Sequence, residues 1–309
     1  MTTTAMPRSA ESAGAPAPTG PRLDRNRFNW GTWPLLLPAL GLLVVLFVVP
    51  VIYSFYIGFT NLKLVGPTSV NFDFTGLANV QRLVGDAVFQ KSIVLTAIFV
   101  FGSGVIATTL IALILALAMQ RALVGLSALT GALVLGAFVL PPVTIGIIWY
   151  AASIPGGGMS WLIGNPEADL LNGAPMIAVS AANAWSLTGI AMLMFGAALR
   201  NIPGDIIEAA QLENAGAWTR FRRITLPLLR PTIMTTVLLV SLLSLANFTI
   251  VYLMTGGGPG TDTMILPVYA YQQAFRFNDL SYGALIGNVM VVFAAIVAAI
   301  SMRLGRTED

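Results

Sequence analysis

The sequence predicts an all-α integral membrane protein with six transmembrane helices. Of its 309 residues, 56% are hydrophobic and 9% are charged, whereas a soluble domain carries about 25% charged residues. Six apolar runs are each long enough to cross a bilayer, and the mean hydropathy of the chain is +0.82. A secretory signal or a single anchor would give one such run, so neither explains the composition.

The first thirty residues are rich in Thr, Ala, Pro, Ser and Gly and carry four Arg. This composition predicts a disordered cytoplasmic tail over residues 1–30, whose positive charge contributes to the topology. Residues 31–309 are predicted to form one six-span domain. Its first span covers about 34–58, where Pro50 is expected to introduce a kink.

The segment after the first span, residues 60–91, is predicted to be external. Residues 74–93 are interpreted as a short amphipathic helix that lies in the membrane interface. The apolar anchors of this helix would be Phe74, Leu77, Val80, Leu83 and Phe89. A docking role for the helix is the second interpretation.

Five further apolar runs complete the six spans. They cover about 92–119, 129–152, 176–199, 232–254 and 282–302. The third run contains Pro141–Pro142, a pair that removes two backbone donors and bends a helix. We interpret this bend as packing geometry, with a gating kink as the alternative. External segments are predicted at 153–175 and 255–280.

Basic residues are distributed unequally between the segments that connect the spans. Twelve of the 16 Lys and Arg residues fall in the tail, in two loops of the predicted cytoplasmic side and at the C-terminus. The four external ones are Lys63, Arg82, Lys91 and Arg276. Because cytoplasmic segments next to spans are enriched in Lys and Arg, both termini are predicted to be cytoplasmic. The same placement accounts for the net charge of +3 without nucleic-acid binding.

The chain lacks two residue types that commonly carry chemistry, Cys and His. Disulfides, thiol catalysis, thiolate metal sites and His-based acid–base catalysis are therefore excluded. Lys occurs only at positions 63 and 91, and neither lies in a G-x-x-x-x-G-K-[ST] loop that could cradle ATP phosphates. The chain is predicted not to be an enzyme, and any ATP hydrolysis that drives it must occur in another subunit.

The loop between the fourth and fifth spans, residues 200–231, has five Arg and three acidic residues and is placed in the cytoplasm. Asp205 is expected to cap a short helix, and Glu208 three residues later would complete a capping box. Asn214 and Gly216 are expected to end this helix.

A second short helix is expected over residues 218–224 of the same loop. Pro227 would mark either the end of this helix or the entry to the fifth span, because a proline cannot donate a backbone hydrogen bond.

This loop resembles the EAA loop in permease subunits of bacterial ATP-binding-cassette importers. The resemblance rests on an E-A-A triplet followed by I-x-L-P at the family spacing, here Glu208, Ala209, Ala210, Ile224, Leu226 and Pro227. The family usually has Gly six residues after the Glu, where this chain has Asn214. Asn tolerates the left-handed backbone conformation, so the turn is expected to persist.

A second segment, MTGGGPGTDT at 254–263, is similar to the T-G-G-G-P segment that follows the fifth span in the carbohydrate branch of this family. The resemblance implies a permease of the maltose or glycerol-3-phosphate type, for a sugar or oligosaccharide. It further implies that this segment lies near the docking face of a substrate-binding protein. The plain interpretation of the segment is a tight external turn.

The resemblance also implies partners and a membrane. These would be a second homologous permease subunit, two ATP-binding-cassette ATPase subunits that hold ATP and Mg, and an extracytoplasmic substrate-binding protein, assembled at the bacterial cytoplasmic (inner) membrane. Glu208, Ala209 and Ala210 would meet a groove on an ATPase, and Asn214 and Gly216 would set the turn. The plain alternative for Glu208 is a capping acid. Arg220, Arg222 and Arg223 are interpreted as topological or facing membrane lipid.

The span cores contain no Asp, Glu, Lys or Arg, which argues against proton coupling but leaves sodium coupling open. Ser244, Asn247 and Tyr252 are predicted to share a helix face and to line the substrate path. Asn183 and Asn288 are interpreted as interhelical hydrogen-bond partners. An ion-coupled secondary transporter and an importer permease for a non-sugar solute, such as a peptide or amino acid, remain the alternatives.

Overall fold

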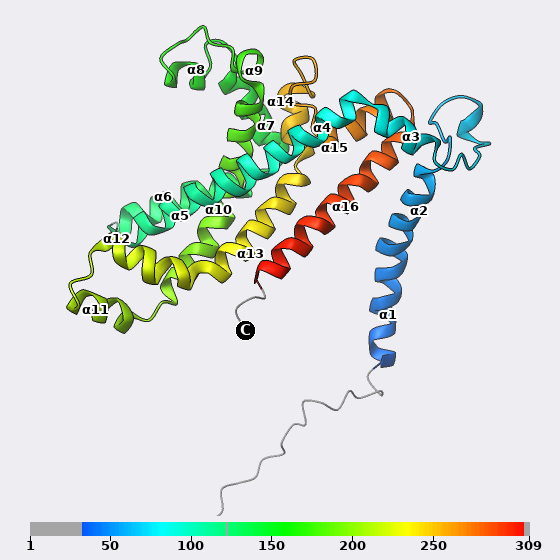
Figure 1. The fold of residues 1–309 in the computed structure, drawn as a ribbon. Helices are drawn as coiled ribbons and strands as arrows, with labels where there is room; N and C mark the ends of the chain where they lie inside the picture. The colour runs from blue at the N-terminus through cyan, green and yellow to red at the C-terminus, as the bar shows by residue number, and fades with distance from the viewer. Residues whose placement is uncertain (1–32, 122, 306–309) are drawn as a thin grey trace, which may run out of the picture. The chain divides into compact units, whose positions relative to one another are not determined.

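The computed structural model describes residues 33–121 and 123–305, and it is built from helices (Figure 1). Within these ranges the only β-type pairing is an isolated bridge between Thr60 and Phe74. The predicted all-α membrane fold is confirmed, with five helices that could cross a membrane, or six if one strongly bent pair counts as a span. The tail predicted over residues 1–30 lies outside the described residues.

The chain divides into two compact units, residues 1–50 and 51–309. The described part of the first unit consists of α1 (Trp33–Leu43), the π-helical turn η2 (Val44–Val48) and the start of α2 (Val49–Gly58). The stretch Leu36–Gly58 is long and apolar enough to be the first span. Its large hydrophobic side chains are mostly exposed, as contact with lipid requires.

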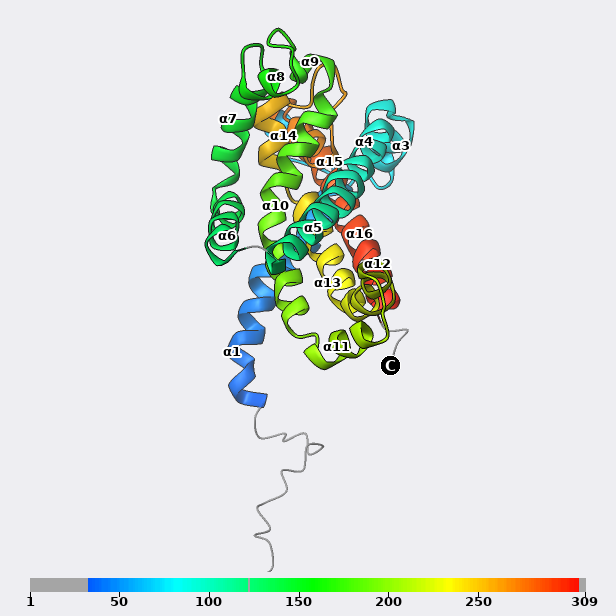
Figure 2. The same cartoon turned by 90° about the vertical axis from the view of Figure 1, so that its left-hand side faces the viewer.

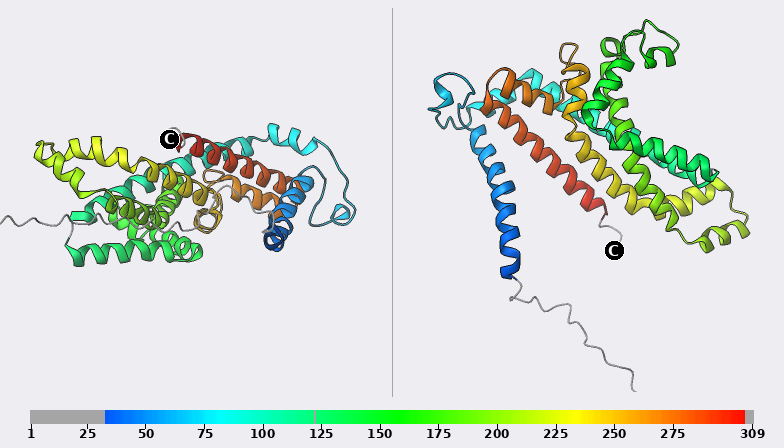
Figure 3. Two further views of the ribbon diagram at one scale, coloured as in Figure 1. Left: turned by 90° about the horizontal axis from the view of Figure 1, so that it is seen from below. Right: turned by 180° about the vertical axis from the view of Figure 1, so that it is seen from behind.

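Three long helices of the second unit correspond to the predicted second, fourth and sixth spans. The second span is continuous from Ala87 to Gln120 and contains a π-helical middle. The helices are α4 (Ala87–Ala97), η4 (Ile98–Ala107), α5 (Thr108–Arg121), α10 (Pro175–Arg200) and α16 (Leu280–Gly305). α10 packs against α5 and α13 (Leu226–Leu245), and α13 packs against α16 (Figures 2 and 3).

The predicted third span is two helices, α6 (Val124–Val139) and α7 (Pro142–Ser153), which meet at 106°. The expected bend is therefore a break. A residue before proline is driven out of the α conformation, and Leu140 and Pro141 both have extended ψ angles, 137° and 141°. The second proline then begins α7, where its missing N–H has no role.

The predicted fifth span, 232–254, is also corrected. One continuous helix begins with α12 (Ala217–Arg220), passes through the π-helical η5 (Phe221–Thr225) and ends with α13 at Leu245. After a break at residues 246–247 the chain resumes as α14 (Phe248–Thr255). Pro227 neither ends a helix nor separates the loop from the span: it lies in the first turn of α13, directly after the π-helical η5.

Shorter elements connect these helices. They are η3 (Pro67–Ser69), α3 (Ala78–Gly85), α8 (Gly158–Leu162), α9 (Leu170–Gly173), α11 (Gly204–Leu212), α15 (Leu266–Tyr271) and η6 (Gln272–Arg276). The single amphipathic helix expected over 74–93 is divided between α3 and α4, because Asp86 caps α4 by accepting from the N–H groups of Val88 (2.9 Å) and Phe89 (3.1 Å).

The second unit contains two buried hydrophobic clusters. The first joins η4, α7, α14, α15 and α16 around Phe99, Ile250 and Tyr282. The second joins α5, α10 and α13 around Phe195, Leu229 and Val240. Helices α3, α8, α9, α14 and α15 lie at one end of this unit, and α11 and α12 lie at the other (Figures 1 and 2). Helix α11 contributes no residue to either cluster, whereas Leu229, farther along the loop range 200–231, belongs to the second.

Candidate functional site

Helix α11 carries the E-A-A triplet, and it begins differently from the prediction. Pro203, with an extended ψ of 130°, occupies the N-cap position, and no side chain caps the first turn. Asp205 lies inside the first turn, where its charge still opposes the helix dipole favourably. The predicted capping box between Asp205 and Glu208 is therefore wrong, because the helix starts two residues too early for Asp205 to cap it.

The turn after α11 agrees with the prediction for Asn214. This residue has φ = 55°, the left-handed conformation that glycine usually adopts at this position. The N–H of Ala215 donates to the carbonyl of Ala210 at 3.0 Å and closes the turn. Gly216 has an extended conformation, φ −62° and ψ 160°, and precedes α12. Any residue type can adopt this conformation, so the backbone does not require glycine at position 216.

Exposure distinguishes α11 from every span of the second unit. None of its nine residues is buried, and Leu212 is 85% exposed. Glu208 and Ala209 are exposed on this helix, and Trp218 in the next helix is 70% exposed. A helix of this length is marginal on its own, so an unburied one with exposed apolar groups is suited to bind a partner.

A buried polar cluster lies where α13 ends. Asn183 of α10 donates through Nδ2 to the Oγ of Ser103 (2.8 Å) and to the Oγ of Ser244 (2.9 Å). Its Oδ1 accepts from Nδ2 of Asn247 at 2.8 Å. Asn183, Ser103 and Ser244 are almost fully buried. The cluster ties η4, α10 and α13 to the break at Asn247, so the interhelical role expected for Asn183 is confirmed.

The three predicted substrate-path residues do not share one helical face. Ser244 lies near the end of α13, Asn247 lies in the break and Tyr252 lies in α14. The three residues are therefore not on one continuous helix, and helical spacing cannot place them on one face. Tyr252 is half-buried, and its ring stacks on Phe248 at 4.9 Å and meets Tyr271 edge-on at 5.0 Å between centroids. The structure brings Ser244 and Asn247 together through Asn183, with an aromatic group one helix turn beyond.

Asn288 was also expected to be an interhelical partner. Its Oδ1 accepts from the Oγ of Ser54 at 2.9 Å, and its Nδ2 donates to the carbonyl of the same residue at 3.1 Å. This pair joins α16 to the last part of α2, as interior amides in membrane helices do.

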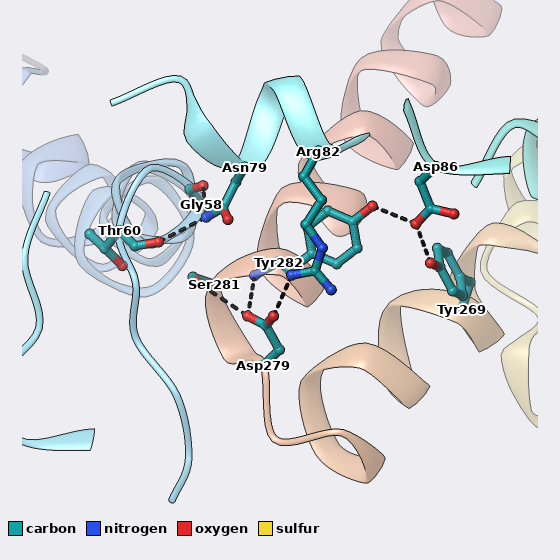
Figure 4. A network of polar contacts seen from close by, with 9 residues as sticks. All are labelled: Gly58, Thr60, Asn79, Arg82, Asp86, Tyr269, Asp279, Ser281 and Tyr282. Carbon is teal, nitrogen blue, oxygen red and sulfur yellow. Dashed lines mark hydrogen bonds and ion pairs between the residues drawn. The ribbon is translucent and has the colours of Figure 1, made fainter. Parts of the chain in front are cut away.

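A charged network that local spacing did not reveal joins α3, α4, α15 and α16 (Figure 4). Asp86 accepts hydrogen bonds from the hydroxyls of Tyr269 and Tyr282, the latter at 2.6 Å. Burial raises the pKa of Asp86, but the two tyrosine hydroxyls and the two backbone N–H groups of α4 together lower it more. The net pKa of this carboxyl is below its ordinary value, so it is ionised at neutral pH.

Arg82 extends the network. Its guanidinium lies 3.8 Å above the ring of Tyr282 and forms an ion pair with Asp279 at 2.6 Å. Asp279 in turn accepts from the N–H of Tyr282 at 3.2 Å, at the start of α16. Asn79 donates to the carbonyls of Gly58 (3.0 Å) and Thr60 (2.8 Å) (Figure 4). We refer to Asn79, Arg82, Asp86, Tyr269, Asp279 and Tyr282 as the Asp86 network.

The T-G-G-G-P segment forms a tight turn between α14 and α15, as its plain interpretation predicted. Gly257 has φ = 98°, and a Cβ there would lie 2.7 Å from the side chain of Met264, so glycine is required. The hydroxyls of Thr255 and Thr263 lie 2.6 Å apart, and Thr263 donates to the carbonyl of Gly258 at 2.8 Å. No cluster of three or more acidic side chains that could hold a metal ion is present in residues 33–121 and 123–305.

Comparisons with known proteins converge on one family. Residues 88–305 match the family described as the binding-protein-dependent transport system inner membrane component. The sulfoquinovosyl glycerol transport system permease protein SmoG of Agrobacterium fabrum is 41% identical over 125 residues, 40% of this chain and 41% of that protein. The trehalose/maltose transport system permease protein MalF of Thermococcus litoralis is 29% identical over 280 residues, 88% of this chain and 92% of that protein.

The fold has a solved counterpart. The crystal structure of a bacterial alginate ABC transporter in complex with an alginate pentasaccharide-bound periplasmic protein contains a chain that matches with a TM-score of 0.72 and 18% identity. The match covers 90% of this chain and 94% of that one, so the likeness of fold extends through nearly the whole molecule.

Proposed function

We propose that this chain, which belongs to the family of binding-protein-dependent transport system inner membrane components, forms the membrane path of an ATP-driven importer for a sugar or oligosaccharide. The family match over residues 88–305 supports the transport role. The sugar class is supported by relatives named for sulfoquinovosyl glycerol and for trehalose and maltose, and by the T-G-G-G-P segment. The chain itself is a transport permease and not an enzyme.

The observation that carries the coupling role is the exposed helix α11. It presents Glu208 and Ala209 on a helix with no buried residue, and the left-handed Asn214 fixes the direction in which the chain leaves it. A rigid helix transmits movement better than a flexible loop. We therefore propose that a separate ATPase subunit, which holds the ATP and Mg, docks on α11. The small side chains of Ala209 and Ala210 would allow this subunit to approach the helix closely.

The complete importer would contain a second homologous permease, two ATPase subunits and an extracytoplasmic binding protein in the bacterial inner membrane. Both termini would be cytoplasmic, since 12 of the 16 basic residues then lie on the cytoplasmic side. A pull-down of the tagged chain in mild detergent tests this composition directly. Recovery of the chain alone, with uptake into vesicles driven by an ion gradient, would favour a secondary transporter instead.

Substitution of Glu208 tests the coupling role most sharply. The variant Glu208→Lys is expected to insert and fold normally, because Glu208 is exposed and is not buried in any cluster. It should recover little ATPase in the pull-down and should lose ATP-dependent uptake. Glu213→Lys is the matched control, since Glu213 is an exposed acid at the C-cap of the same helix. Normal uptake by Glu208→Lys would refute the coupling role.

The substrate path is proposed at the break between α13 and α14. Interrupted helices place free backbone groups and polar side chains at the binding sites of transporters, and Asn247 lies in such an interruption. Ser244 would set the position of Asn247 through Asn183, and Tyr252 would offer an aromatic face to a sugar ring.

The Tyr252→Ala variant tests this path in uptake assays with maltose, trehalose and sulfoquinovosyl glycerol. KM should rise roughly tenfold, which corresponds to about 1.4 kcal/mol of lost contact energy. Recovery of ATPase in the pull-down should be unchanged. Tyr150→Ala, an exposed tyrosine of α7, is the control. If both variants change KM equally, the assignment of the path is wrong, while transport of peptides or amino acids instead of the three sugars would overturn the sugar class.

A further inference from the structure

A large groove lies on the second unit beside the loop 200–231. It has a volume of about 1380 Å³ and is lined by residues from α5, α6, α10, α11 and α12. Most of its wall is apolar, with Leu117, Leu135, Met192, Leu193, Ile207 and Phe221 among the lining residues. Such a hollow, left open between packed helices, is large enough for part of a lipid or for an inserted protein segment.

Two cations line the same groove. Arg200 is the last residue of α10 and Arg220 is the last residue of α12. Neither forms an ion pair with an acidic side chain among the described residues 33–121 and 123–305. Glu208 is the acidic residue in the lining, so two positive charges face one negative charge. The groove is apolar within and carries a net positive charge.

The groove lies where three candidate membrane spans end or begin. The candidate spans Ala87–Gln120 and Pro175–Arg200 both end at it, and the span Ala217–Leu245 begins there. Its lining along α10 runs from Met192 to Arg200, which is roughly 12 Å of helix measured into the span. Trp218, exposed at 70%, belongs to the lining and is a residue type that favours the interface. With these spans in a bilayer, the apolar part of the groove would face the hydrocarbon level and the arginines would face the headgroup level.

We propose that this groove binds an anionic phospholipid, with its phosphate at Arg200 and Arg220 and an acyl chain along α5, α6 and α10. Two arginines can hold a phosphate through charge-assisted hydrogen bonds, and anionic headgroups are enriched at the cytoplasmic leaflet. A soluble protein surface would bring polar groups against the apolar wall, which is costly. The lipid would fill the space next to Ile207 and Glu208, so the position of α11 would depend on it.

The proposal separates the arginines of the loop into two classes. Arg200 and Arg220 line the groove, whereas Arg222 and Arg223 are exposed and do not. The double variant Arg200→Gln/Arg220→Gln therefore has a matched control of equal charge change, Arg222→Gln/Arg223→Gln. A third variant, Gly196→Leu, fills the groove without a change of charge, since a Cβ at Gly196 meets no atom within 4 Å.

Native mass spectrometry of the purified chain, titrated with phosphatidylglycerol, tests the proposal. Phosphatidylglycerol should bind more tightly than phosphatidylcholine of the same acyl chains, and the Arg200→Gln/Arg220→Gln variant should weaken this binding roughly tenfold. Gly196→Leu should weaken it as well, and the Arg222→Gln/Arg223→Gln control should not.

Three results would overturn the proposal. One is equal loss of phosphatidylglycerol binding in the two arginine double variants. Another is full competition by an equal concentration of glycerol phosphate, which would mean that the groove recognises a free phosphate and not a lipid. The last is loss of bound phosphatidylglycerol when the chain is purified with its partner subunits, which would mean that a protein segment occupies the groove.

Discussion

The two ends of the second unit use charged residues in opposite ways. At one end, the Asp86 network pairs its charges within the chain, through Asp86 with two tyrosines and through Arg82 with Asp279. At the other end, α11 has no buried residue, and its acidic side chains form no ion pair among the described residues. The first end is built to hold its own helices together, while the second leaves its charges available to other molecules.

Among the variants that test this difference, removal of the Asp86 carboxylate should have the largest effect on the stability of the protein. Asp86→Ala removes the cap of α4 and leaves two tyrosine hydroxyls without their acceptor, at a total cost of roughly 3 kcal/mol in the free energy of unfolding. Thermal unfolding in detergent measures this cost, with the loss of soluble protein on heating as the readout. The control is Asp205→Ala in the first turn of α11, which should change stability by less than about 1 kcal/mol. Equal losses would show that the two ends do not differ in this way.

A pair of glycine substitutions should give the next largest effect. A Cβ at Gly283 would lie 2.6 Å from the Cβ of Ala274 and 2.8 Å from the carbonyl oxygen of Ala270, so Gly283→Ala must push α16 away from α15 and η6. Overpacking of this kind costs about 2 kcal/mol. Gly204→Ala in α11 meets no atom within 4 Å and should be neutral or slightly stabilising, because alanine favours the helix.

The same thermal measurement compares the two glycine variants. A similar loss of stability in both variants would mean that the end with α11 is packed as tightly as the end with the Asp86 network. The two ends would then not differ in packing.

The smallest effect is expected from pH. Because the pKa of Asp86 in the folded state is below its ordinary value of 3.8, the stabilisation it provides is complete above that value and is lost as the pH falls through the folded pKa. The stability difference between the native chain and Asp86→Asn should therefore shrink as the pH is lowered from about 5 to about 3. A difference that stays constant over this interval would mean that the carboxylate charge of Asp86 contributes nothing.

Local sequence signals predicted the turn that ends α11 correctly but not the residue at which α11 begins. The left-handed turn at Asn214 could be predicted because the conformation depends on the residue type and its immediate neighbours. The start of α11 could not, because Pro203 competed with Asp205 for the cap position and fixed the entry to the helix first. The role of α11 in coupling remains a prediction that the Glu208→Lys variant will test.

The breaks in two spans likewise separate what local sequence predicts from what depends on packing. The pair Pro141–Pro142 predicted a bend, since two successive prolines inside an apolar run remove two backbone donors, but the angle of 106° depends on how α7 packs. The break at Asn247 has no proline or glycine to announce it. It is accompanied by hydrogen bonds from Asn183 to Ser244 and from Asn247 to Asn183, which join residues 61 and 64 positions apart.

The sequence by itself determined that this protein is helical, that it crosses the membrane several times and that one polar loop of a recognisable pattern projects from it. These properties follow from composition and short-range spacing, which each segment carries alone. Only the tertiary structure decided the Asp86 network, in which Asp86 and Tyr282 lie 196 positions apart, and the groove that gathers Arg200 and Arg220. Contacts between distant segments depend on the packing of whole helices, and no local pattern of residues encodes that packing.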